Sequence, residues 1–204
     1  GFNQISNTHE NIYNTETQYY ITVSPGNGKR IQPFIQPAQS AQENLTVFRD
    51  YQYHETDEFN LAAVGRRWFG DKFDIENTKV FQFNFPDLVS TDPIDVKVIA
   101  ASASGSPSSM KISVNGTQQS VLNFPGLAAT NGLLVNEAIY NGTIPASNDL
   151  VTVQLEHNKQ GNPSSEAFID YITVKATRTL RFNGTQFSFT PNYANPNSTT
   201  VKIG

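Results

Sequence analysis

The chain has 204 residues, a formal net charge of −4 and no cysteine, which excludes a disulfide framework and thiolate–metal sites. Because it carries no basic stripe, nucleic acid is not an expected partner, and no apolar run approaches the roughly 20 residues that span a membrane. Only 16% of the residues are charged, and Asn, Thr, Ser and Gln fill the surface instead, a composition that suits an extracytoplasmic β-protein.

Residues 1–53 are predicted to be a loose segment followed by hairpin strands. Residues 18–23 are rich in Tyr, Ile, Thr and Val, which are typical of strands. Residues 25–28 then carry turn chemistry, and residues 31–35 form a short edge strand interrupted by a proline. A further strand is predicted over residues 45–53.

Residues 54–74 are predicted to form one long loop around Trp68, the only tryptophan of the chain. Gly65 and Gly70 bracket the tryptophan and suit tight turns with positive φ. A helical turn is expected over residues 59–64. Loops of this length are usually functional or packed by their own side chains.

The chain after this loop alternates apolar and polar residues with period two, the pattern of half-buried strands. No segment shows a helical stripe, and Asn-Gly pairs at 115, 141 and 183 predict hairpin turns. We therefore predict an all-β, antiparallel β-sandwich of the jelly-roll type over residues 54–190, with residues 191–204 as a linker toward a downstream domain. The expected strands are residues 81–85, 94–100, 110–114, 133–140, 151–155 and 168–176, with a final hairpin over residues 180–189.

Several segments, in order along the chain, resemble one protein family. Residues 53–73 hold an acidic stretch, an apolar patch and a Gly-Arg-x-Trp-x-Gly-like core. Residues 18–31 resemble an upstream hairpin of that family, and residues 81–86, 100–104 and 168–180 resemble later strands. The family is the gingipain-like cysteine peptidases of the type IX secretion system, in particular their sortase branch.

The resemblance implies a β-rich region that precedes a peptidase domain. The family's nucleophile is a cysteine paired with a histidine, and this chain has no cysteine. The chain is therefore expected to be non-catalytic, whereas its parent would be a cysteine endopeptidase that removes sorting signals from cargo. The implied partners are that peptidase domain, secretion-system proteins or cargo, and the implied location is the outer-membrane surface or the medium.

The Trp68 segment supplies the candidate contact residues. Arg66, Arg67, Trp68, Phe69 and Phe73 are predicted to contact the adjoining domain or a partner. The alternative is a sugar-stacking platform formed by the three aromatic side chains. We favour packing or interdomain docking, because aromatic residues bracketed by glycines more often anchor loops.

Acidic residues close to the arginines allow two interpretations. Glu55, Asp57 and Glu58 could bind calcium, which takes carboxylate oxygens at flexible geometry. They could instead form ion pairs with Arg66 and Arg67 within the loop. We favour the ion pairs and expect no cofactor.

Asp170 and the histidines complete the candidate polar residues. Asp170 shares strand parity with Ile172, so it is expected to point inward and to pair with Arg178 or a loop amide in a structural role. His9, His54 and His157 have no spacing that would gather a zinc ion.

Two further hypotheses belong to other functional classes. A jelly roll can be a carbohydrate-binding module, which would show an exposed, coplanar aromatic pair. It can also be an adhesin-like domain, with every aromatic residue buried and no pocket. A stand-alone enzyme has the least support, because no nucleophile–base or paired-carboxylate arrangement is visible in the sequence.

Overall fold

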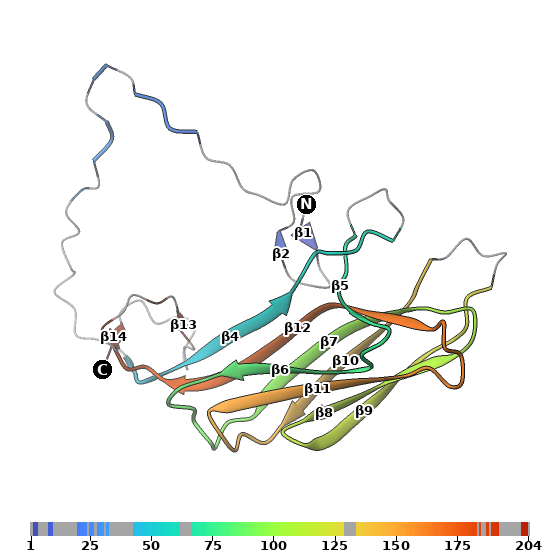
Figure 1. Ribbon diagram of the computed structural model, residues 1–204. Coiled ribbons are helices and arrows are strands. Elements are labelled where there is room, and N and C mark those ends of the chain that lie inside the picture. The colour runs from blue at the N-terminus through green and yellow to red at the C-terminus, as the bar shows by residue number, and fades with distance from the viewer. Residues whose placement is uncertain are drawn as a thin grey trace.

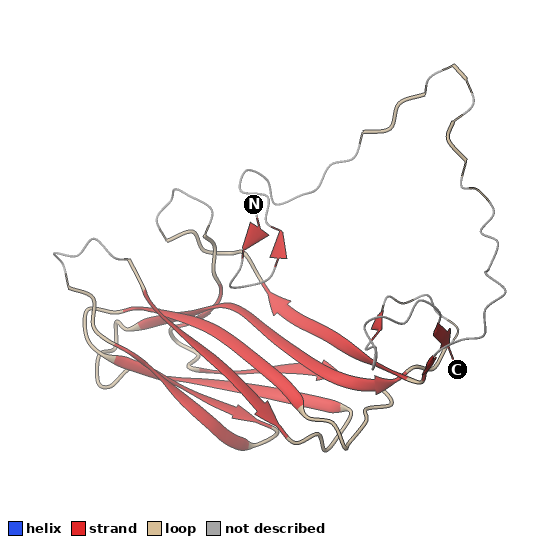
Figure 2. Cartoon of the chain, turned by 180° about the vertical axis from the view of Figure 1, so that it is seen from behind, coloured by secondary structure: helices blue, strands red, loops and turns tan. Residues whose placement is uncertain are grey.

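The described chain folds into two antiparallel β-sheets that pack face to face (Figures 1 and 2). The computed structural model describes residues 2–3, 8–9, 20–23, 25–26, 28–30, 32, 43–61, 67–128, 134–182, 184, 187, 189–191 and 201–203. These residues include strands and loops but no helix, which confirms the predicted all-β sandwich. In this part of the chain there is accordingly no helix long and apolar enough to cross a membrane.

The larger sheet has six strands, with the order β10-β7-β12-β4-β13 and β5 paired beside β12. Its centre is β12, which has 14 residues and is the longest strand of the described chain, as predicted. The strands are β4 (Val47–Glu55), β5 (Gly70–Phe73), β7 (Ile94–Ala103), β10 (Asn136–Ile144), β12 (Glu166–Thr179) and β13 (Thr190–Pro191).

The smaller sheet has four strands in the order β6-β11-β8-β9. Asn115 and Gly116 join β8 to β9 with φ values of 49° and 79°, the left-handed conformation that a type I′ turn requires. The chain crosses between the sheets from β6 to β7 to β8 and again from β9 to β12, which is the winding of a jelly roll. The strands are β6 (Thr78–Asn84), β8 (Ser108–Val114), β9 (Thr117–Phe124) and β11 (Leu150–Asn158).

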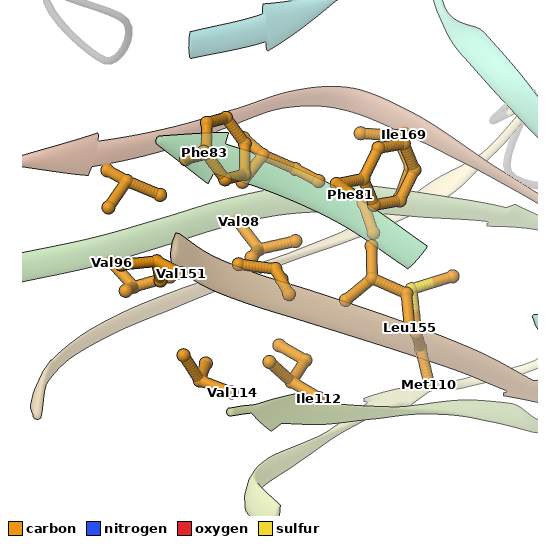
Figure 3. Close-up of a cluster of buried hydrophobic side chains, with 14 of the residues drawn as sticks. Phe81, Phe83, Val96, Val98, Met110, Ile112, Val114, Val151, Leu155 and Ile169 are labelled. Carbon is orange, nitrogen blue, oxygen red and sulfur yellow. The ribbon is translucent and has the colours of Figure 1, made fainter. Parts of the chain in front are cut away.

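The hydrophobic core lies between the two sheets. Most of the strands contribute alternate side chains, as the sequence alternation predicts, for example Val151, Val153 and Leu155 of β11. Figure 3 shows Phe83 and Leu155 of the smaller sheet packed toward Val98 and Ile169 of the larger sheet. Burial of such side chains stabilises the fold by about 25 cal/mol per Å² of apolar surface.

Short strands lie outside the sandwich sheets. β1 (Phe2–Asn3) pairs with β2 (Thr8–His9), and β14 (Val201–Ile203) pairs in parallel with β3 (Glu43–Leu45). Part of the segment predicted as a linker, residues 191–204, is therefore paired to the chain near the start of β4.

The predicted hairpin over residues 18–35 is wrong in its described part. Residues 20–23 form no strand, and Tyr20, Ile21 and Val23 are almost fully exposed. The remaining residues of that prediction fall largely outside the described chain. The preference of Tyr, Ile and Val for strands reflects how well they pack on a half-buried sheet. These exposed residues have no such packing, so their preference does not produce a strand.

The predicted turn at Asn141-Gly142 is also wrong. Strand β10 runs straight through both residues, which face Lys97 and Val96 of β7. A Cβ at Gly142 would lie 1.8 Å from the Tyr140 hydroxyl oxygen, so the glycine makes room for that side chain. Pairing with β7 gives the backbone N–H and C=O groups of these residues partners within the sheet, whereas a turn would expose some of them to water.

The described residues of the predicted final hairpin over residues 180–189 form no strand, and the chain crosses to another strand after them. After β12, Gly184 takes a φ of 91°, and Thr190–Pro191 then pairs with Phe48 and Arg49 of β4. Phe48, Leu45 and Leu180 form a small buried cluster beside this crossing. Asn183 lies outside the described residues.

Candidate functional site

The Trp68 loop is shorter than predicted, because strands occupy both ends of residues 54–74. Strand β4 continues to Glu55 and β5 begins at Gly70, so the loop is residues 56–69. Phe59 and Phe69 close its base: each donates its backbone N–H to the other's carbonyl, at 2.8 and 2.9 Å. Residues 62–66, with Gly65, Arg66 and the second half of the predicted helical turn, lie outside the described chain.

Phe69 and Phe73 point into the protein. Phe69 is buried in a second apolar cluster with Phe168 and Ala101, on the side of the larger sheet away from the main core. The ring centroids of Phe69 and Phe168 are 6.3 Å apart. Phe73 lies fully buried in the main core. The two phenylalanines therefore anchor the loop, and the alternative, a platform of three exposed aromatic rings, does not exist.

Carboxylates on two strands of the larger sheet hold Arg67 in place. Its Nη2 donates to Asp170 Oδ2 of β12 at 2.7 Å and also to Glu137 Oε2 of β10. Its guanidinium also lies over the Phe69 ring, 5.4 Å from the centroid. The arginine thus fixes the loop across the outer face of the larger sheet, through charge-assisted hydrogen bonds.

The predicted orientation of Asp170 is wrong because β12 carries a β-bulge. The pairing with β7 shifts between Ile169 and Tyr171, so Asp170 is the extra residue. The bulge reverses the alternation of side chains. Ile169 and Ile172 both face the core, whereas Asp170 lies on the outer face with Phe168.

The predicted Asp170–Arg178 pairing is also wrong. Arg178 donates from Nη1 to Asp50 Oδ2 at 2.7 Å and from Nε to the Pro86 carbonyl at 2.6 Å. The partner of Asp170 is Arg67, 103 residues away in the sequence. Asp50 and Asp170 are each ion-paired to an arginine, and sequence spacing has no signal for either pairing.

Trp68 is the aromatic side chain of this loop that stays available for contact. It is 38% exposed, between the clamped Arg67 and the buried Phe69. An exposed tryptophan on a rigid base loses little conformational entropy when it binds, and tryptophan is enriched at the centres of interfaces. The geometry therefore concentrates the predicted contact role in Trp68, with Arg67 beside it.

Gly70 joins the loop to β5 through close packing and not through a positive φ. A Cβ at Gly70 would lie 1.7 Å from Thr56 Oγ1 and 2.4 Å from the Thr56 carbonyl oxygen. The positive φ of this corner, 46°, belongs to Asp71. Asp71 accepts hydrogen bonds from Thr56 Oγ1 at 3.3 Å and contacts His54 Nε2 at 2.5 Å.

Gly70→Ala is expected to lower the free energy of unfolding by about 2 kcal/mol, because the new methyl group displaces Thr56. Urea unfolding of the purified variant measures the change. Gly105→Ala is the matched control, since nothing lies within 4 Å of its Cβ position, and it is expected to change stability by about 0.5 kcal/mol or less. Equal costs for the two variants would contradict the close-packing argument.

No cation site is visible in the described part of the chain. The His, Asp and Glu side chains of this part, Glu55, Asp57 and Glu58 among them, form no group of three or more that could hold a metal ion. Arg67 forms its ion pairs with Glu137 of β10 and Asp170 of β12, and both carboxylates lie outside the loop.

Sequence reasoning missed a buried pair formed by His157 and Ser165. Ser165 Oγ lies 3.4 Å from His157 Nε2, and both side chains are buried. Burial, with a smaller contribution from Lys159, lowers the pKa of His157 to about 4. Val151, Val153 and Leu155 alternate along β11, and residue 157 continues the same inward face. Because histidine is polar, the sequence pattern does not indicate that His157 is buried. A pair without solvent access has no route to a substrate, so we assign it a structural role.

Comparison with solved structures relates the fold to part of a larger protein. The dimeric latent form of PorU from Porphyromonas gingivalis matches with a TM-score of 0.64 and 16% identity, over 80% of this chain and 16% of that one. A family 35 carbohydrate-binding module from an environmental isolate matches with a TM-score of 0.39, and the CBM36-1 domain of a termite-hindgut xylanase with 0.35. The family 35 module is 16% identical, and the match covers 74% of this chain and 97% of the module. The CBM36-1 domain is 14% identical, and the match covers 64% of this chain and 96% of the domain.

No protein-family model and no curated protein sequence matches the chain. At 16% identity the likeness to PorU concerns the fold, and the chain spans about a sixth of the PorU chain. The protein has a PorU-like β-sandwich fold.

Proposed function

We propose that this chain is a non-catalytic β-sandwich region of a gingipain-like, PorU-type sortase. In that role it braces the peptidase domain of the same protein, or contacts cargo or secretion partners, through the Trp68 loop. The parent protein would be a cysteine endopeptidase that acts on the outer-membrane surface or in the medium.

One observation carries the proposal: 80% of this chain superposes on part of PorU, with a TM-score well above those of the carbohydrate-binding modules. The absence of cysteine supports a non-catalytic role for these residues. The clamped base of the loop and the exposure of Trp68 support its use as a contact point.

Reading the gene downstream of Gly204 tests the proposal directly. A following α/β domain with a histidine and a cysteine in gingipain-like context is expected. A stop codon, or a sugar-hydrolase domain, would contradict the proposed parent protein.

Trp68→Ala is expected to weaken binding between this chain and that peptidase domain by about tenfold or more, because a buried interfacial tryptophan typically contributes 2 kcal/mol or more. Surface plasmon resonance with the two parts produced separately measures the affinity. Phe182→Ala is the control, since it removes another exposed aromatic side chain. Unchanged affinity in Trp68→Ala would remove the loop from the interface.

A further inference from the structure

The outer face of the larger sheet carries a concavity of about 370 Å³ that the proposed function does not use. The register of four strands places side chains there in rows. One row is Tyr53, Thr173, Lys97 and Asn141, from β4, β12, β7 and β10. The next row is Tyr51, Lys175, Asp95 and Thr143 from the same four strands. The volume lies within the range of about 300 to 1,000 Å³ of small-ligand sites.

The lining of this concavity holds two lysines and one aspartate, in a chain whose net charge is negative. Asp95 lies in the concavity, but Arg49 Nη2 donates to its Oδ2 at 2.7 Å and Thr143 donates to its Oδ1 at 3.0 Å. Lys97 and Lys175 are the cationic side chains that line the concavity.

The two lysines repel one another. Burial, and after it the nearby Lys175, lower the pKa of Lys97 below its ordinary value, and the Asp170 carboxylate offsets part of this shift. A bound anion would relieve this repulsion, because an opposite charge stabilises the protonated form of an amine.

Aromatic rings border the lysines. Tyr51 and Tyr53 are exposed on β4, with ring centroids 6.0 Å apart, and they alternate along one face of the strand. Lys175 Nζ lies over the Tyr51 ring at 5.6 Å, and Lys97 Nζ lies over the Tyr171 ring at 5.2 Å. Ring faces and ammonium groups therefore adjoin on one surface.

Neutral hydrogen-bonding side chains fill the space between the charges. Asn141 and Thr143 are exposed on β10, and Thr173 of β12 is paired with Lys97 of β7 and lies two residues before Lys175. Hydroxyl and amide groups of this kind pair with the hydroxyls of a sugar, while ring faces cover its C–H surface. An acidic peptide would use the lysines but would have little use for this combination.

We propose that the concavity bordered by Tyr51 and Tyr53 binds an acidic oligosaccharide, whose sugar carboxylate lies between Lys97 and Lys175 and whose rings lie against the tyrosines. This site is distinct from the Trp68 loop. Its occupation does not depend on the identity of the parent protein.

Hexamers of galacturonate, mannuronate and hyaluronan, titrated into the full chain by calorimetry at low ionic strength, test the proposal. Saturable binding of at least one hexamer with a submillimolar dissociation constant is expected. The methyl-esterified form of the hexamer that binds is the matched ligand control, and it is expected to bind about tenfold more weakly or worse, because it lacks the charges that pair with the lysines.

Lys175→Gln and Tyr53→Ala are each expected to weaken binding about tenfold, and both residues are exposed enough to change without unfolding the sheet. Lys111→Gln is the control, because Lys111 pairs with Glu156 on the smaller sheet. Trp68→Ala is expected to retain full binding.

Three results would each overturn the proposal. They are the failure of all three hexamers to bind, equal binding of the esterified hexamer, and unchanged binding in both Lys175→Gln and Tyr53→Ala. Binding of a poly-glutamate hexapeptide as tightly as the best sugar would also overturn it, since the surface would then be an acceptor of acidic peptides.

Discussion

Leu155→Ala is expected to lower the free energy of unfolding by about 2 to 5 kcal/mol. Leu155 lies fully buried in β11 (Figure 3). It pairs with Lys79 of β6 and with Ile112 of β8. Truncation removes apolar burial and leaves a cavity between the sheets, which backbone pairing on both sides of β11 prevents from closing.

Equilibrium urea unfolding measures this loss. The matched control is Leu150→Ala in the same strand, because Leu150 is 43% exposed at the strand's end. The control is expected to cost about 1 kcal/mol or less. Equal losses for the two variants would mean that the sheet interface is not the main source of stability.

The second large effect is a loss of stability in acid that depends on His157. Its pKa in the folded protein is about 4, against an ordinary value of 6.5. Folding therefore favours the neutral imidazole, and its full contribution is present above pH 6.5. As the pH falls from 6.5 toward 4, the unfolded chain binds a proton that the folded chain does not. We expect this group alone to cost about 3 kcal/mol over that window.

Comparison with His157→Phe isolates the effect, because all other titrating groups are shared. Thermal unfolding of both proteins at several pH values between 7 and 4 gives the two stability curves. The variant is expected to lose about 3 kcal/mol less than the unmodified chain across this range. Parallel curves would show that His157 does not titrate with a depressed pKa.

Most of the sandwich follows from local patterns in the sequence. The alternation in residues 81–85, 94–100 and 151–155 predicts strands that β6, β7 and β11 confirm. A strand with one buried face must place an apolar side chain at every second position. The alternation therefore predicts a strand whichever sheet covers that face. Asn115-Gly116 predicts its turn for the same local reason, because its two residues take positive φ.

The candidate contact site could be predicted only in part. The sequence singles out the Trp68 segment, but it does not separate Trp68 from Phe69, which differ in exposure because one faces solvent and the other faces Phe168. The clamp from Arg67 to Asp170 joins residues 103 positions apart, and no local pattern encodes that distance.

The sequence by itself determined the fold class, the positions of the main strands and the lack of a cysteine nucleophile, because composition and side-chain period act locally. Only the tertiary structure decided which Asn-Gly pair turns and which stays in a strand, since a neighbouring strand satisfies the backbone at Asn141. The tertiary structure also decided on which face of the larger sheet each side chain lies. One bulged residue in β12 moves Asp170 to the outer surface, and strand register gathers Tyr51, Tyr53 and Lys175 there from segments more than 100 residues apart.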